Sequence, residues 1–207
     1  MIEVTVWVGA TLAAVPLAQS LRRRLGSRLA GWEAEIAFWS AAAYGVLPLY
    51  GAWISGAVIG RDCGLTGFTP AAWLRGIAIC ALLLGALGFG LRSPALRRLA
   101  GTWFSPGGSW LVLFDEPRWA LYRGAGSAFF PSALAAQLIG LTLGALEWLI
   151  RGGRPARVSD PAVALGLIRL AGSALLFALT HNLWLIVITQ AAALALIRRS
   201  TGTTMPG

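Results

Sequence analysis

The sequence predicts an all-α fold, a polytopic transmembrane helical bundle with about six or seven membrane crossings, one of them interrupted or re-entrant. Of the 207 residues, 57% are hydrophobic and only 12% are charged, and the charges stand in short stretches between long apolar runs. An average soluble domain carries about 25% charged residues. The mean hydropathy of +0.71 agrees with a chain that lies mostly within a bilayer.

A helix needs about 20 apolar residues to cross the hydrocarbon core of a bilayer. The predicted spans are 2–20, 33–60, 71–91, 127–150, 161–180 and 182–198. The first span lacks a basic leader and ends in arginines, so we expect a retained anchor and not a cleaved signal. We expect one integral membrane domain over 1–207, with N-terminal helices in 1–102 and a disordered tail at 200–207.

The positions of the arginines require one more crossing. If Arg22 to Arg28 lie in the cytoplasm, Arg92 to Arg98 return there two spans later. Without a further crossing, the arginines at 151–157 and 198–199 would lie outside, against the positive-inside tendency. A crossing or re-entrant segment between 103 and 126 places them inside. The N-terminus is then outside and the C-terminus inside, in what we expect to be a bacterial cytoplasmic membrane.

The segment available for this crossing, FDEPRWALYRG at 114–124, is charged. Its ionisable residues are Asp115, Glu116, Arg118 and Arg123. Ionisable residues inside a bilayer are costly and mark a functional site by default. Pro117 would break a helix at this point, which is tolerated where the freed backbone faces protein or water.

The alternative places this segment at the membrane surface. A helix over 109–126 would then lie flat, with Trp103, Trp110 and Trp119 among the lipid headgroups.

The charged residues also have structural interpretations. Glu116 and Arg123 stand two helical turns apart, on one side of a helix, and Glu147 can pair with Arg151 at i, i+4. Arg169, in the middle of a span, needs an acidic partner, for which Glu147 or Glu116 are the candidates.

The polar residues of the last spans have similar interpretations. His181 and Asn182 are expected to cap a tight turn. Gln190 is expected to form an interhelical hydrogen bond, worth about 1 kcal/mol or less in a bilayer. The small residues Gly140 and Gly144 indicate close helix packing.

No metal or cofactor site is expected. The cysteines Cys63 and Cys80 are 17 positions apart, so we expect no disulfide, and with the single histidine they give no zinc-binding spacing. The formal net charge of +9 comes from arginines just beyond the ends of the spans. This is how topology-setting charge is distributed, so nucleic acid is not an expected partner.

Two stretches resemble motifs of the CPBP family, the CAAX-protease and bacteriocin-processing membrane proteins. LTHNLWLIVITQAAALALI, at 179–197, is similar to the closing motif, in which Asn-Leu-Trp precedes a helix carrying His and, four residues on, Asn or Asp. RWALYRG, at 118–124, is similar to the first motif, Glu-Glu, three residues and Arg-Gly. The resemblance covers roughly the C-terminal half and implies a CPBP-like core over 103–199.

The resemblance implies peptide-bond hydrolysis within the membrane. In the family a glutamate activates water, while histidines and a polar residue hold the oxyanion. Glu116 is then the first candidate for the catalytic base and Glu147 the second, with His181 and Gln190 as polar partners. The substrate would be a membrane-embedded or prenylated peptide.

The chain departs from the family at several motif positions. Arg118 and Trp119 stand in place of the paired glutamates, and Gln190 stands at the closing His position. Glu147, in LGALE, stands at the His position of the middle motif, Phe-x-x-x-His. A second register aligns LEWLIRG, 146–152, with the first motif and FALTH, 177–181, with the middle one, but the chain then stops before the third.

The sequence favours two functions over a third, a small-solute transporter, for which paired broken helices in two related halves are expected and only one such segment is visible. One is a divergent CPBP-like membrane protein that hydrolyses peptides with substituted residues, or has lost that activity as a pseudoenzyme. The other is a non-catalytic scaffold or accessory subunit, whose partners are other membrane subunits. In both, membrane lipid surrounds the chain.

Overall fold

The computed structural model describes residues 1–25, 33–102, 111–151 and 161–202, and within these ranges it contains helices and no strand. The all-α prediction is therefore confirmed. The elements are α1 (Ile2–Leu25), α2 (Glu33–Ile54), α3 (Pro70–Gly90), α4 (Pro94–Thr102), the 3-10 helix η2 (Leu111–Phe114), α5 (Asp115–Phe129), α6 (Ala133–Arg151), α7 (Pro161–Thr180) and α8 (Leu183–Thr201).

Three of the described helices are long and apolar enough to cross a membrane. They are Pro70–Gly90, Ala133–Ile150 and Leu183–Thr201, and shorter apolar stretches lie at Ile2–Ala14 and Leu167–Thr180. Helix α3 also leaves large apolar side chains exposed, among them Leu82 and Phe89. Large exposed apolar surfaces of this kind mark contact with a membrane or another protein, so the structure agrees with membrane association.

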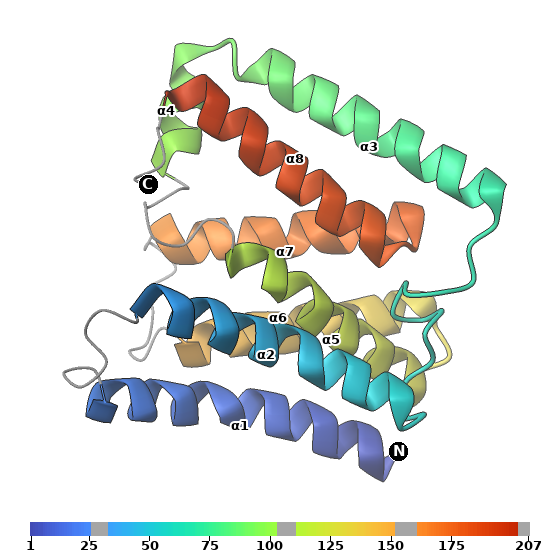
Figure 1. Cartoon of the computed structure of the whole chain (residues 1–207). Coiled ribbons are helices and arrows are strands. Elements are labelled where there is room, and N and C mark those ends of the chain that lie inside the picture. The colour runs from blue at the N-terminus through green and yellow to red at the C-terminus, as the bar shows by residue number, and fades with distance from the viewer. Residues whose placement is uncertain (26–32, 103–110, 152–160, 203–207) are drawn as a thin grey trace.

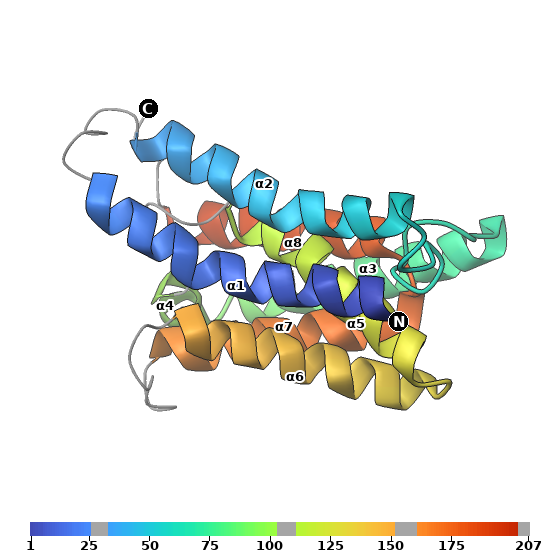
Figure 2. The same ribbon diagram turned by 90° about the horizontal axis from the view of Figure 1, so that it is seen from below.

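The long helices lie alongside one another, and α5 runs through the interior of the bundle (Figures 1 and 2). The C-terminal ends of α1, α3, α6 and α8 gather at one end of the bundle, at the left in Figure 1. The N-terminus lies at the opposite end. The described arginine positions 22–24, 92 and 198–199, at or just after the ends of α1, α3 and α8, therefore share one end of the molecule.

The predicted span at 127–150 is wrong, because the structure divides it between two helices. Helix α5 ends at Phe129 and α6 begins at Ala133. The residue before Pro131 is Phe130, which has an extended backbone with φ −131° and ψ 126°. Proline disfavours the helical conformation in the residue before it and cannot itself donate a helix hydrogen bond.

Pro117 lies in the first turn of α5, not at a break within it. A proline is tolerated there because the first backbone N–H groups of a helix have no intrahelical acceptor. The N-cap, Phe114, has no capping side-chain hydrogen bond. The negatively charged carboxylates of Asp115 and Glu116 in this first turn interact favourably with the positive end of the helix dipole.

Helix α5 is buried on all sides. Every residue from Asp115 to Gly126 except Pro117 is buried, and Trp119 is only 1% exposed. A helix that is buried all round belongs to the interior of a bundle. The alternative of a surface helix is therefore wrong for the described part of 109–126, and Trp103 and Trp110 lie outside the described residues.

Two other boundaries differ from the sequence expectation. Helix α2 ends at Ile54, and residues 55–69 form a loop. Helix α8 continues to Thr201 and is capped by Gly202, which has a left-handed φ of 67°. The expected disordered tail is therefore wrong for residues 200–202, and 203–207 lie outside the described residues.

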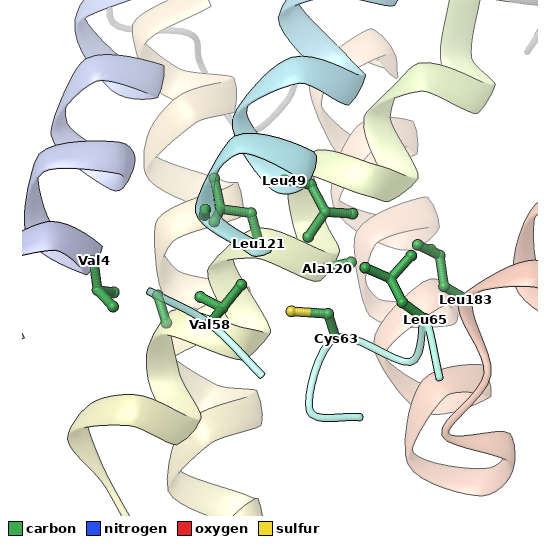
Figure 3. Close-up of a cluster of buried hydrophobic side chains, with 10 residues drawn as sticks. Val4, Leu49, Val58, Cys63, Leu65, Ala120, Leu121 and Leu183 are labelled. Atoms are coloured by element: carbon green, nitrogen blue, oxygen red, sulfur yellow. The ribbon is translucent and has the colours of Figure 1, made fainter. Parts of the chain in front are cut away.

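The loop after α2 folds against α5 in a buried apolar cluster (Figure 3). Val58, Cys63 and Leu65 of the loop pack with Leu121 of α5 and Leu183 of α8. Both cysteines are free and buried. Burial raises the pKa of the Cys63 thiol to about 12, although the nearby Arg123 guanidinium acts in the opposite direction.

Small residues allow α5 and α6 to approach closely. A Cβ atom on Gly126 would lie 2.9 Å from the Cα atom of Ala136, and one on Gly140 would lie 2.8 Å from Cγ of Arg123. A Cβ atom on Gly144 would meet Leu170 Cδ1 at 2.8 Å. The prediction that Gly140 and Gly144 indicate helix packing is confirmed.

Gly126→Ala is expected to lower the thermal unfolding midpoint in detergent, because the new methyl group meets α6 backbone that cannot move aside. Overpacking of this kind costs about 1–3 kcal/mol. Gly85→Ala is the matched control, since a Cβ atom there has nothing within 4 Å, and the control should unfold at the same or a higher temperature. Equal midpoints for the two variants would contradict the close α5–α6 packing.

Candidate functional site: a buried ion cluster

Helix α5 presents its charges to two groups of neighbours. Asp115, Arg118 and Tyr122 are spaced i, i+3 and i+7, so they lie along one side of the helix. Glu116 and Arg123 are also two turns apart and share another side. All five side chains are buried, so each charge needs a partner within the protein.

Glu116 is held by two other helices. Ser173 of α7 donates a hydrogen bond of 2.5 Å to Oε2 of Glu116, and Nε2 of Gln190 of α8 donates to Oε1. Nη2 of Arg123 lies 4.0 Å from Oε2 of Glu116. Both carboxylate oxygens therefore accept hydrogen bonds from protein side chains.

Arg123 completes this first group. Its Nη1 donates to Oγ of Ser173 over 3.3 Å, so the serine hydroxyl accepts from the arginine and donates to Glu116. The guanidinium carbon lies 4.4 Å from the centroid of the Phe177 ring. Within the described residues, Nε and Nη2 of Arg123 have no hydrogen-bond acceptor. The face of the Phe177 ring instead supplies a cation–π contact to the guanidinium.

Arg118 centres the second group. Its Nε donates to Oε2 of Glu147, of α6, over 2.8 Å, and its Nη2 donates to Oδ1 of Asp115. The hydroxyl of Tyr122 donates to the same Oε2 of Glu147 over 2.9 Å. The guanidinium carbon also lies 4.5 Å from the centroid of the Tyr44 ring, of α2.

Arg169 of α7 connects the two groups. Its Nη1 lies 3.6 Å from Oδ2 of Asp115, and its Nη2 donates to Oε1 of Gln190 over 3.5 Å. Its guanidinium carbon is 5.6 Å from the centroid of the Trp119 ring. The ion cluster therefore contains three carboxylates and three guanidiniums. They are Asp115, Glu116, Glu147, Arg118, Arg123 and Arg169.

The structure brings most of the predicted site residues together. Glu116, Glu147 and Gln190 all belong to the cluster. His181 does not, because it is exposed in the turn between α7 and α8, with a φ of 49° and its ring edge-on to Phe177. Asn182 caps α8 by accepting a hydrogen bond from the backbone N–H of Leu185, so the predicted capped turn is confirmed.

The predicted pairings meet different outcomes. The Glu116–Arg123 pair and the interhelical hydrogen bond of Gln190 are confirmed. Arg169 forms an ion pair with Asp115, a partner that the sequence analysis did not consider, because the two residues belong to helices whose relative register the sequence leaves open. The side chain of Arg151, the predicted partner of Glu147, lies outside the described residues.

Three members of the cluster were missed. Ser173 stands four residues after Arg169, and Tyr122 stands four residues after Arg118, so i, i+4 spacing places each on the same helix face as its charged neighbour. That spacing could have identified both. Tyr44 carries no such signal, since it comes from α2 and meets Arg118 only through the tertiary fold.

Neither candidate base is exposed at the surface of the structure. Glu116 and Glu147 are both 0% exposed. An apolar groove of about 470 Å³ between α2 and α8 is bordered by Phe114, Pro117 and Trp184, but neither glutamate lines it. Among the described residues, no group of three His, Cys, Asp or Glu side chains could hold a metal ion.

No family model, curated protein or solved structure matches the chain. The resemblance to the CPBP family therefore stays a prediction that rests on the quoted motifs.

The Arg118–Glu147 pair is expected to be strongly coupled. Glu147→Gln or Arg118→Gln alone should each lower the free energy of unfolding by about 3–5 kcal/mol, because each leaves a buried charge without its partner. The double variant should be less destabilised than the sum of the two, since Asp115 keeps Arg169 and Glu116 keeps Arg123. Unfolding in mixed micelles measures the coupling.

The matched control for this cycle is the Arg61–Asp62 pair, whose closest approach is 3.9 Å and whose arginine side chain is exposed. Exposed pairs contribute about 0–1 kcal/mol. Strictly additive effects at Arg118 and Glu147, like those expected of the control, would show that the buried pair is not a structural unit.

Proposed function

We propose that the protein is a non-catalytic integral membrane protein that serves as a scaffold or accessory subunit of a membrane complex. Its buried ion cluster sets the arrangement of the helices. The bundle crosses a bacterial cytoplasmic membrane seven times, with η2 and α5 forming the interrupted crossing. The N-terminus lies outside and the C-terminus inside.

The distribution of arginines supports this orientation. The stretches at 22–24, 92–98 and 198–199 lie at or just beyond the ends of α1, α3 and α8, which gather at one end of the bundle (Figure 1). A cytoplasmic position for that end satisfies the positive-inside tendency for all of them.

Labelling with a membrane-impermeant maleimide tests the orientation. In a Cys80→Ala background, Cys63 should stay unlabelled because the thiolate, the reactive form, is scarce for a buried thiol with a pKa of about 12. Ile2→Cys should be labelled in intact cells, whereas Leu96→Cys should be labelled only after permeabilisation. The reverse pattern, or equal labelling of both sites, would contradict the orientation.

The observation that carries the non-catalytic proposal is that both carboxylate oxygens of the fully buried Glu116 accept hydrogen bonds from protein side chains. A general base must reach the proton that it removes, directly or through one water. Both oxygens of this carboxylate instead accept hydrogen bonds from Ser173 and Gln190. The surrounding charges balance, as a structural cluster in a medium of low dielectric constant requires.

An intramembrane hydrolase of CPBP type is the second candidate. The apolar groove favours it, because the groove is bordered by Pro117, the residue that follows Glu116. A membrane-embedded or prenylated peptide could approach the start of α5 along this groove. In that case the loss of Glu116 or Glu147 would abolish cleavage.

A rescue experiment separates the two candidates. Glu116→Gln should lower the thermal midpoint and the yield of the assembled complex, because Arg123 is left without its carboxylate. The double variant Glu116→Gln/Arg123→Met should recover both, since it removes the uncompensated charge together with its partner. Thermal unfolding, the stoichiometry of co-purified subunits in mild detergent, and the peptide content of the membranes are measured together.

A catalytic Glu116 would give a different result. Peptide products present with the wild type would then disappear in both Glu116 variants, including the folded double variant. That outcome, or a lone monodisperse monomer with intact function, would overturn the scaffold proposal.

A further inference from the structure

A basic cleft lies at the arginine-rich end of the bundle, away from the ion cluster. It is formed where the end of α3, the turn after it, α4 and the end of α8 meet, and its volume is about 480 Å³. Its lining combines apolar and cationic residues. The residues that line it include Gly88, Leu91, Leu196, Arg92, Arg97 and Arg199.

A small buried cluster adjoins the cleft, since Leu91 belongs to both. Leu91, Ala100 and Ile197 form this cluster, which joins the end of α3 to α4 and α8. Nη2 of Arg97 donates to the backbone carbonyl of Arg92 over 3.5 Å. The guanidinium carbon of Arg92 lies 5.6 Å from the centroid of the Phe89 ring. The fold therefore fixes the backbone positions of the arginines.

The three arginines lack acidic partners in the part of the chain that the structure describes. Arg92, Arg97 and Arg199 are exposed, and the ion pairs among the described residues involve other side chains. Like charges around one cleft repel one another, and the guanidinium group is well suited to bidentate binding of phosphate. The cleft is therefore complementary to an anion.

We propose that this cleft binds the phosphate of an anionic phospholipid, with the lipid chains along Gly88, Leu91 and Leu196. A site lined by both arginines and apolar residues at the end of a membrane helix matches both parts of such a lipid, and basic pockets between membrane helices bind anionic headgroups. The proposal uses the membrane placement given above but is independent of the role of the ion cluster. A free phosphate shares the headgroup chemistry, and the experiment distinguishes the two.

The test uses the full-length protein in neutral detergent. Binding of phosphatidylglycerol, phosphatidylcholine and inorganic phosphate is titrated and followed by native mass spectrometry and thermal shift. Phosphatidylglycerol should bind more tightly than phosphatidylcholine. Arg92→Gln, Arg97→Gln and Arg199→Gln should each weaken its binding by about fivefold, since one arginine near a membrane surface contributes about 1 kcal/mol. Arg75→Gln, an exposed arginine near the other end of α3, is the control and should bind as the wild type does.

A second pair of variants tests the apolar part of the cleft lining. A Cβ atom on either Gly88 or Gly85 has nothing within 4 Å, so the first side-chain atom meets no neighbour at either position, but only Gly88 lines the cleft. Gly88→Leu should weaken binding of phosphatidylglycerol. Gly85→Leu is the control and should bind it as the wild type does. Inorganic phosphate should fail to displace the lipid at equal concentration.

Every outcome decides the proposal. Arginine-dependent lipid binding that Gly88→Leu also weakens supports it. Inorganic phosphate that binds or competes as well as the lipid overturns the lipid assignment and leaves a soluble anion as the ligand. Equal binding by the three arginine variants and Arg75→Gln, or equal binding of the two phospholipids, overturns the site itself. Because the ion cluster is unaltered in all of these variants, their result is separate from that of the Glu116 rescue.

Discussion

The burial of four charged residues on one short helix is the constraint on which the rest of the bundle depends. From Asp115 to Gly126, apart from Pro117, helix α5 is buried, so its charges need partners within the protein, partly along α5 itself and partly on neighbouring helices. Arg118 pairs with Glu147 of α6 and Asp115 pairs with Arg169 of α7. Glu116 accepts a hydrogen bond from Gln190 of α8. Each of these partners comes from a different helix, and the cluster thereby fixes the rotation of those helices about α5 as well as their proximity.

This electrostatic arrangement requires close packing of the backbone. Polar partners reach one another only because Gly126, Gly140 and Gly144 let α5, α6 and α7 approach without intervening Cβ atoms. In a bilayer, where helices gain little from burying apolar surface, such small-residue contacts and interhelical hydrogen bonds are what hold helices together. Packing and charge pairing are therefore two parts of one interaction in this protein.

The two kinds of charge in the chain have separate roles. The interior cluster is balanced, so the formal net charge of +9 lies entirely outside it. Much of that excess is carried by arginines at or just beyond the ends of helices that gather at one end of the bundle. Charges inside the bundle are paired with other side chains, whereas the arginines around the basic cleft are exposed.

The sequence by itself determined the all-α class, the apolar helices, and the unusual position of the charged segment at 114–124. Periodicity sufficed for the Glu116–Arg123 pair, because both residues lie on one helix and local geometry fixes their spacing. The division of 127–150 at Pro131 was also readable locally but was missed. Only the tertiary structure decided that Arg169 meets Asp115, that Tyr44 covers Arg118, and that His181 stays exposed at a turn. Those contacts depend on the rotation and register of separate helices, which no local pattern in one segment specifies.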